Sequence, residues 1–159
     1  MLFSSLSLRT LGPKPELNLM QFFQKCPSLV DYFMEELNNY IKVKSMYPPL
    51  YPIALLLSRL TPFDNVESAV RDTHEKNSKL LRREQLNKFI PLLVEAGNTP
   101  NYMGRVIIGK ALLPFLQRNN IIEFCTQLLK DTTVKGGMNK LHNELLIVYH
   151  LLSSLHELE

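Results

Sequence analysis

Cysteine is scarce in this sequence of 159 residues. Its two cysteines, Cys26 and Cys125, lie far apart and form no Cys-X-X-Cys motif. That spacing excludes both a disulfide framework and a zinc cluster held by paired cysteines. A reducing, cytoplasmic compartment fits this cysteine usage best.

Long hydrophobic runs are also missing. The longest uninterrupted run near the centre is Ile53–Leu57, whereas a membrane-spanning helix needs roughly 20 apolar residues, so we expect no membrane insertion. The N-terminal residues 1–12 are rich in serine, lack acids and contain Arg9. They are compatible with a short organellar transit peptide, but their apolar spacing favours an amphipathic helix that Gly12-Pro13 ends.

The motifs of catalysis and of cofactor binding are absent as well. No Gly-rich turn between a strand and a helix is present to hold a nucleoside cofactor, and no nucleophile elbow can be located. His142 and His150 are eight residues apart, which is roughly 12 Å of helix rise and too far for one metal ion. We therefore expect no cofactor, no metal site and no catalysis by this chain alone.

Acidic residues are missing from 96–122, which contain Arg105, Lys110 and Arg118. This stretch is a local positive band in a chain whose net charge is +3, from 18 Lys and Arg against 15 Asp and Glu. Such a charge permits a polyanionic partner but is far from a basic arm.

Helical periodicity is what the sequence does contain. A hydrophobic content of 45% is ample for one buried core. After Pro27, apolar residues recur on one helical face at Val30, Phe33, Leu37 and Ile41. Further helices are predicted at 53–60 after a proline-forced turn, at 84–96 with an interruption at Pro91, at 103–116 with Pro114 in the last turn, and at 121–130.

The last predicted helix follows Gly136-Gly137 and has a narrow apolar stripe. The stripe consists of Leu141, Leu145, Val148, Leu152 and Leu155. Residues 63–83 are polar and are predicted to form a solvated loop between two helical halves. With seven short helices and no period-two segment, residues 1–159 are predicted to form a single all-α segment, an α-solenoid of the HEAT or armadillo kind.

Two apolar units, Tyr47–Leu60 and Arg105–Leu116, carry one or two cations each and no carboxylate. Helices of this type stack and offer a surface, which favours a scaffold over an enzyme. Six blocks of sequence, in their order and rough spacing, resemble the central region of the thyroid adenoma-associated protein (THADA) family and its fungal relatives. The blocks are Leu2–Arg9 with Gly12, Phe22–Leu29, Tyr47–Leu60, Phe89–Pro91, Arg105–Leu113 and Asn139–His142.

Members of that family are very large helical-repeat proteins, so the resemblance implies that this chain is a fragment of a larger superhelix. The fungal relatives are non-catalytic partners of an FtsJ-like methyltransferase that modifies a ribose 2′-hydroxyl in the tRNA anticodon loop. The resemblance therefore implies a regulatory scaffold in tRNA methylation, whose partner enzyme supplies the S-adenosylmethionine site.

Six cations are candidates for contact with tRNA or with the partner: Arg9, Lys14, Arg59, Arg105, Lys110 and Arg118. On a helix, Arg105 and Lys110 are separated by about 140° and do not line one groove. Arg105 is expected to bind carbonyls or a carboxylate of the adjoining repeat, with a tRNA phosphate as the alternative, and Lys110 is the better phosphate candidate.

Two other functions stay open from the sequence. One is a protein-only adaptor whose paired helices recognise a partner's helix or peptide. The other is a truncated fragment that does neither. If Arg9, Lys14, Arg59, Lys110 and Arg118 gather on one surface, RNA binding is favoured, whereas scattering among carboxylates favours the adaptor.

Overall fold

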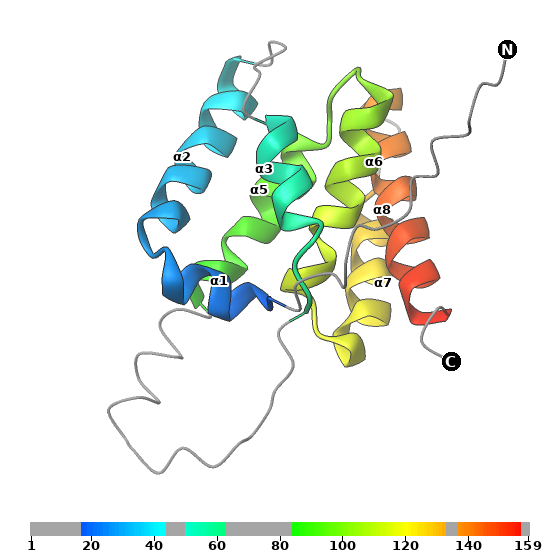
Figure 1. Cartoon of the computed structure of the whole chain (residues 1–159). Helices are drawn as coiled ribbons and strands as arrows, with labels where there is room; N and C mark the ends of the chain where they lie inside the picture. The colour runs from blue at the N-terminus through cyan, green and yellow to red at the C-terminus, as the bar shows by residue number, and fades with distance from the viewer. Residues whose placement is uncertain (1–16, 44–49, 63–83, 133–136, 157–159) are drawn as a thin grey trace, which may run out of the picture.

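A computed structural model of the chain describes residues 17–43, 50–62, 84–132 and 137–156, and these residues are almost entirely helical (Figure 1). The helices are α1 (Leu19–Lys25), α2 (Ser28–Val43), α3 (Leu50–Leu57), α5 (Phe89–Ala96), α6 (Tyr102–Ala111), the 3₁₀ helices η1 (Leu113–Phe115) and η2 (Arg118–Asn120), α7 (Ile121–Asp131) and α8 (Met138–His156). Extended structure within those ranges is limited to one isolated bridge between Asn18 and Thr61. The all-α prediction is therefore confirmed.

Several predictions fall outside the described residues. They concern the N-terminal helix or transit peptide at 1–12, the polar loop at 63–83, and the cations Arg9 and Lys14. Where the structure does describe the chain, none of the helices combines the length and the apolar character that crossing a bilayer requires.

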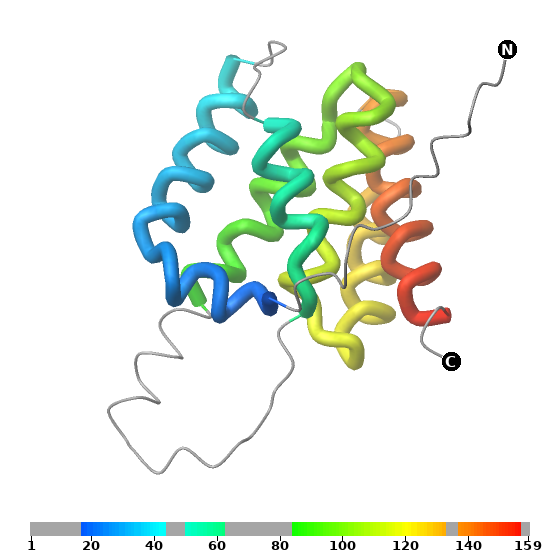
Figure 2. Tube along the Cα trace, viewed as in Figure 1, coloured from blue at the N-terminus to red at the C-terminus, as the bar shows by residue number. Residues whose placement is uncertain are grey.

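The main helices form three successive antiparallel pairs, α2 with α3, α5 with α6, and α7 with α8 (Figures 1 and 2). The second helices of the pairs lie side by side, α3 against α6 and α6 against α8. Among the first helices, α2 packs against α5. This is the stacking of a helical-repeat protein, in which each pair buries the faces of its neighbours.

A chain of phenylalanine rings connects the helices around the core. The ring of Phe23 in α1 lies 6.1 Å from that of Phe33 in α2 and 5.6 Å from that of Phe89 in α5. Phe89 in turn stacks on Phe115 of η1 at 5.3 Å. Rings at these separations attract one another beyond the burial of their area, so they hold α1 and η1 onto the first two helix pairs.

Helix α1 was not among the predicted helices. Its N-terminus is a capping box, because the Asn18 side chain accepts from the backbone N–H of Gln21 at 2.8 Å while the Gln21 side chain accepts from that of Asn18 at 3.4 Å. A cap residue followed three positions later by Gln is readable in a sequence. That signal could have identified the helix.

Two predicted helix boundaries shift at prolines. Helix α3 begins at Leu50 instead of Ile53, because Pro52 fits the first turn, where a backbone N–H has no intrahelical partner. The helix also ends at Leu57 instead of Leu60. In the predicted helix 84–96 the interruption is real but falls at Lys88, three residues before Pro91. A proline has no N–H to donate to the carbonyl four residues earlier, and its ring crowds that carbonyl, so the break in the helix lies before the proline.

The predicted helix 103–116 is shorter than expected. Helix α6 ends at Ala111 and the chain continues as η1, which contains Pro114. The missing N–H and the ring of Pro114 disfavour another α-helical turn, and a tighter 3₁₀ turn takes its place. By contrast, the predicted helix 121–130 matches α7 to within one residue.

The predicted apolar stripe of the last helix is only partly right, because Val148 and Leu155 pack against the core but two of its leucines do not. Leu145 and Leu152 are 50% and 41% exposed, whereas Ile147 and Leu151 are fully buried beside Asn143 and Glu144. Helix α8 therefore buries a face that contains an amide and a carboxylate, and turns Leu145 and Leu152 outward. A periodicity count treats Asn and Glu as solvent-facing and so selects the other face.

Candidate functional site

Arg105, a predicted contact residue, lies in α6 at the interface with α8. Its side chain is only 9% exposed. Its Nη1 donates to the carbonyl oxygen of Thr99 at 2.5 Å and to Oδ1 of Asn139 at 3.3 Å, and its Nε donates to Nδ1 of His142 at 2.9 Å. The guanidinium thus joins the loop before α6 to the first turns of α8.

The local sequence sets up this cluster. The side chain of Asn101 caps α6 by accepting from the N–H groups of Met103 and Gly104 at 3.0 and 3.4 Å, which fixes where the helix starts. Arg105 was expected to bind carbonyls or a carboxylate of the adjoining repeat. The carbonyl that it binds, that of Thr99, belongs to its own helix pair, and the acceptors in the adjoining pair are an imidazole and an amide of α8. A contact of Arg105 with RNA stays a prediction.

The other predicted contact cations are exposed where the structure describes them. Arg59 follows α3, Lys110 lies in the last turn of α6, and Arg118 lies in η2. Helices α3 and α6 lie side by side and run in the same direction, and both end near the middle of the molecule in Figure 1, whereas η2 lies below them. The three positions are thus on neighbouring segments at different levels of the bundle.

The two histidines considered as metal ligands have separate environments. His142 accepts from Arg105, while His150 is half-buried and its Nε2 has no hydrogen-bond partner in the described part of the chain. Burial lowers the pKa of His150 below 6.5, and the positive charge of Lys110 lowers this pKa further. Within the described ranges, no three His, Cys, Asp or Glu side chains are grouped closely enough to hold a metal ion.

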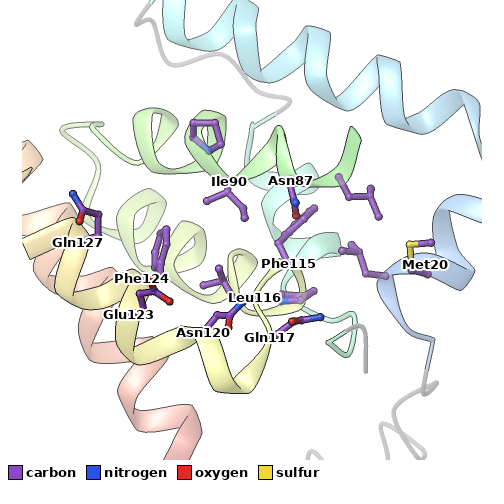
Figure 3. A pocket seen from close by; sticks show the side chains of 14 residues that line it. Met20, Asn87, Ile90, Phe115, Leu116, Gln117, Asn120, Glu123, Phe124 and Gln127 are labelled. Carbon is purple, nitrogen blue, oxygen red and sulfur yellow. The ribbon is translucent and has the colours of Figure 1, made fainter. Parts of the chain in front are cut away.

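A groove separates the first helices of the second and third pairs, α5 and α7 (Figure 3). It has two connected parts, of about 480 and about 290 Å³. Both parts are lined by Ile90, Pro91, Phe124 and Gln127. In Figure 3, labelled side chains from α1, from the segment before α5, from η1 and from α7 line the larger part. We call this feature the α5–α7 groove.

The charges along the α5–α7 groove are mostly negative. Its lining contains four carboxylates and one ammonium group: Glu95, Glu123, Asp131, Glu144 and Lys140. The buried carboxylate of Glu144 accepts from the Thr132 hydroxyl at 2.7 Å and lies 3.9 Å from the Lys140 ammonium nitrogen. The remaining three carboxylates are exposed, and none of them forms an ion pair in the part of the chain described here.

No pattern in the sequence predicted this groove. One local signal was available, because Glu123, Gln127 and Asp131 follow each other at intervals of four and so form a polar row on one face of α7. The partner wall comes from α5, however, and nothing in the spacing of either helix places the two opposite each other. The groove could therefore be found only in three dimensions.

Comparison with known proteins agrees with the resemblance found in the sequence. Residues 1–151 match the family described as Trm732, C-terminal TPR repeats. Proteins named tRNA (32-2′-O)-methyltransferase regulator THADA are similar to the chain: 28% identical in Gallus gallus, 27% in Mus musculus and 26% in Homo sapiens, in each case over 176 aligned residues. Each alignment covers 97% of this chain and 8% of the relative, so the chain spans a small part of the curated relatives it matches. No solved structure gave a match. Because the family match extends over nearly the whole chain, the chain belongs to the family of Trm732 C-terminal TPR repeats.

Proposed function

We propose that this chain is a non-catalytic, helical-repeat part of a regulator that assists a tRNA 2′-O-methyltransferase of the FtsJ-like class. The match over residues 1–151 carries this proposal, because the relatives that align with 97% of the chain are named regulators of a tRNA methyltransferase that acts at position 32. In this proposal the enzyme supplies the methyl donor site, and the chain acts in the cytoplasm by holding enzyme and tRNA together.

Stacked helix pairs suit this role because they present long surfaces on a fixed frame. The bonds of Arg105 to Thr99, Asn139 and His142 keep α6 and α8 in one relative position. A rigid frame loses little conformational entropy when a partner binds. Its surfaces are therefore preorganised for two partners at once.

The proposed tRNA contacts are the exposed cations Arg59, Lys110 and Arg118. Lysine and arginine on phosphates release counterions, so the affinity for RNA should fall as salt rises. The α5–α7 groove is unsuited to phosphate because its exposed carboxylates repel it. Enzyme and tRNA would accordingly occupy different surfaces.

Co-purification of the chain with the FtsJ-like methyltransferase and tRNA of the same cell tests the proposal. We expect the three components to be recovered together, and no product when the chain is supplied with methyl donor and tRNA alone. Recovery of neither partner, or methylation by the chain alone, would contradict the proposal.

A charge-reversed variant tests the RNA contacts separately. Arg59→Glu/Lys110→Glu/Arg118→Glu should reduce tRNA recovery and leave enzyme recovery intact. The matched control, Lys25→Glu/Lys42→Glu/Lys130→Glu, changes the net charge equally at exposed positions of α1, α2 and α7. Equal losses in both variants would mean that tRNA responds only to overall charge.

A second candidate function is that of a protein-only adaptor, which the negative charge of the α5–α7 groove favours. An adaptor would retain the methyltransferase and would recover no tRNA when the enzyme is left out. The two functions thus differ in whether the chain binds tRNA on its own.

A further inference from the structure

We propose that the α5–α7 groove binds a cationic amphipathic helix of a partner protein. This inference rests on the proposed function and deepens it, because it names the kind of segment through which a protein partner would dock. The groove would be a protein interface and not an RNA surface.

The size of the groove fits a short helix. Its walls are the 8 residues of α5 and the 11 residues of α7, which rise by about 12 and about 16 Å. That length corresponds to two or three turns of a bound helix. The larger part of the groove, about 480 Å³, has room for several apolar side chains.

The floor of the groove is apolar and only partly covered. Ile90, Phe115 and Phe124 pack against the core but remain half-buried, and Pro91 is exposed. Figure 3 shows Ile90, Phe115 and Phe124 around the larger part of the groove. Apolar side chains at intervals of three and four on a partner helix would cover these residues, as in other helix-in-groove interfaces.

The exposed carboxylates at the edge of the groove, which we call its rim, favour a positively charged partner. Glu95, Glu123 and Asp131 are exposed and lack an ion-pair partner among the described residues. Asn98 donates to Glu95 at 3.0 Å and Gln127 donates to Asp131 at 3.0 Å, so these neutral donors orient two of the carboxylates without neutralising them. Lysine or arginine beside the apolar stripe of a partner would complement this rim.

The walls favour a helix over an extended peptide. Both are helices whose backbone N–H and C=O groups bond internally, so they offer no free edge to an incoming strand. An extended peptide would bury its own backbone groups without partners there. A helix brings its backbone bonds with it, and only its ends need partners.

The two ends of the groove also differ in a way that orients the bound helix. At one end, the buried Nε2 of Gln117 has no hydrogen-bond partner among the residues that the structure describes, and it matches the free carbonyls of a helix C-terminus. At the other end, Glu95, Asp131 and Glu144 match the positive end of a helix dipole. The bound helix would therefore run antiparallel to α5 and α7.

Fluorescence anisotropy on the full chain tests this inference with a defined probe. The probe is a labelled 14-residue helix of leucine and lysine with leucine on one face, and the reference is the same composition in scrambled order. Glu95→Gln/Glu123→Gln/Asp131→Asn neutralises the rim with nearly isosteric side chains. Asp31→Asn/Glu35→Gln/Glu36→Gln on α2 makes the same change of charge outside the groove.

We expect the amphipathic probe to bind more tightly than the scrambled one. Rim neutralisation should weaken binding about tenfold at low salt, since each exposed ion pair accounts for roughly a 1.4- to 5-fold change. The α2 variant should change binding less than twofold, and Gln117→Leu should weaken it about threefold, the size expected for one hydrogen bond. Circular dichroism confirms that each variant keeps its helices.

Equal weakening in the rim and α2 variants, or equal binding of the two peptides, would overturn the inference. The inference would also be overturned if an anticodon stem-loop RNA bound to the chain, if rim neutralisation strengthened that binding, and if the peptide displaced the RNA. The groove would then be an RNA surface. The peptide measurement itself contains neither methyltransferase nor RNA. A failed peptide experiment therefore leaves the co-purification test of the proposed function intact.

Discussion

Replacing Arg105 by methionine tests whether this residue is structural or a contact residue. Methionine keeps most of the apolar stem of the side chain and removes all of its donors. Three bonds are lost, to the carbonyl of Thr99 at 2.5 Å, to Nδ1 of His142 at 2.9 Å and to Oδ1 of Asn139 at 3.3 Å. The last two acceptors are only partly buried or exposed, so water can replace the guanidinium there.

The magnitude follows from the acceptors. A hydrogen bond from a charged donor contributes roughly 1.5–3 kcal/mol, and a buried acceptor left unpaired costs about 1–3 kcal/mol. The full cost applies to the carbonyl of the buried residue Thr99, and only part of it applies to the other two acceptors. We expect Arg105→Met to lower the free energy of unfolding by about 2–4 kcal/mol. For a chain of this length each kcal/mol lowers Tm by roughly 2–4 °C.

Urea and thermal unfolding followed by circular dichroism measure this loss. Arg105→Lys should lose less, about 1–2 kcal/mol, because an ammonium group can still reach one acceptor but cannot serve three in a plane. Lys110→Met makes the same replacement at an exposed position of the same helix and should change stability by less than about 0.5 kcal/mol. If Arg105→Met unfolds like the wild type, or if Arg105→Lys is fully stable but loses affinity for tRNA, the structural role is refuted.

Two further predictions concern the packing of α8. Gly97→Ala should destabilise the fold by about 1–3 kcal/mol in urea, because a Cβ at this position would lie 2.2 Å from Oδ1 of the fully buried Asn143; an unchanged or higher urea midpoint would contradict this. The pKa of His150 is lower in the folded chain than in the unfolded chain, so on acidification the unfolded chain binds a proton at this histidine first. The neutral His150 therefore contributes fully to stability above pH 6.5, and this contribution declines as the pH falls from 6.5 toward the folded pKa. Lys110→Met removes one cause of that lowering and should make the decline in urea midpoint between pH 7.5 and 5 shallower, and a steeper decline would be inconsistent with this assignment.

Local sequence signals predicted most of the helices, because periodicity and stop signals are properties of neighbouring residues. They failed where tertiary contacts decide. Asn143 and Glu144 are buried on α8 because Val94, Asn98 and Thr132 supply hydrogen bonds, and such partners are invisible to a count of apolar residues. The outward leucines of the same helix then resembled its core face.

The candidate site shows the same limit. Arg105 was expected to bind carbonyls or a carboxylate of the adjoining repeat. The carbonyl that it binds is that of Thr99, just before its own helix, and its partners in α8, Asn139 and His142, lie 34 and 37 residues further along the chain. Only the packing of α6 on α8 brings them within reach. The α5–α7 groove depends likewise on the separation of two helices that the chain does not connect directly. Long-range geometry of this kind has no local signature.

Transfer of a labelled methyl group from S-adenosylmethionine to an anticodon stem-loop RNA tests the proposed role most directly. The reaction is run with the FtsJ-like methyltransferase alone, with this chain alone, and with both. We predict no transfer by the chain alone and more transfer by the pair than by the enzyme alone. Transfer by the chain alone, or equal transfer by enzyme and pair, would contradict a non-catalytic regulator.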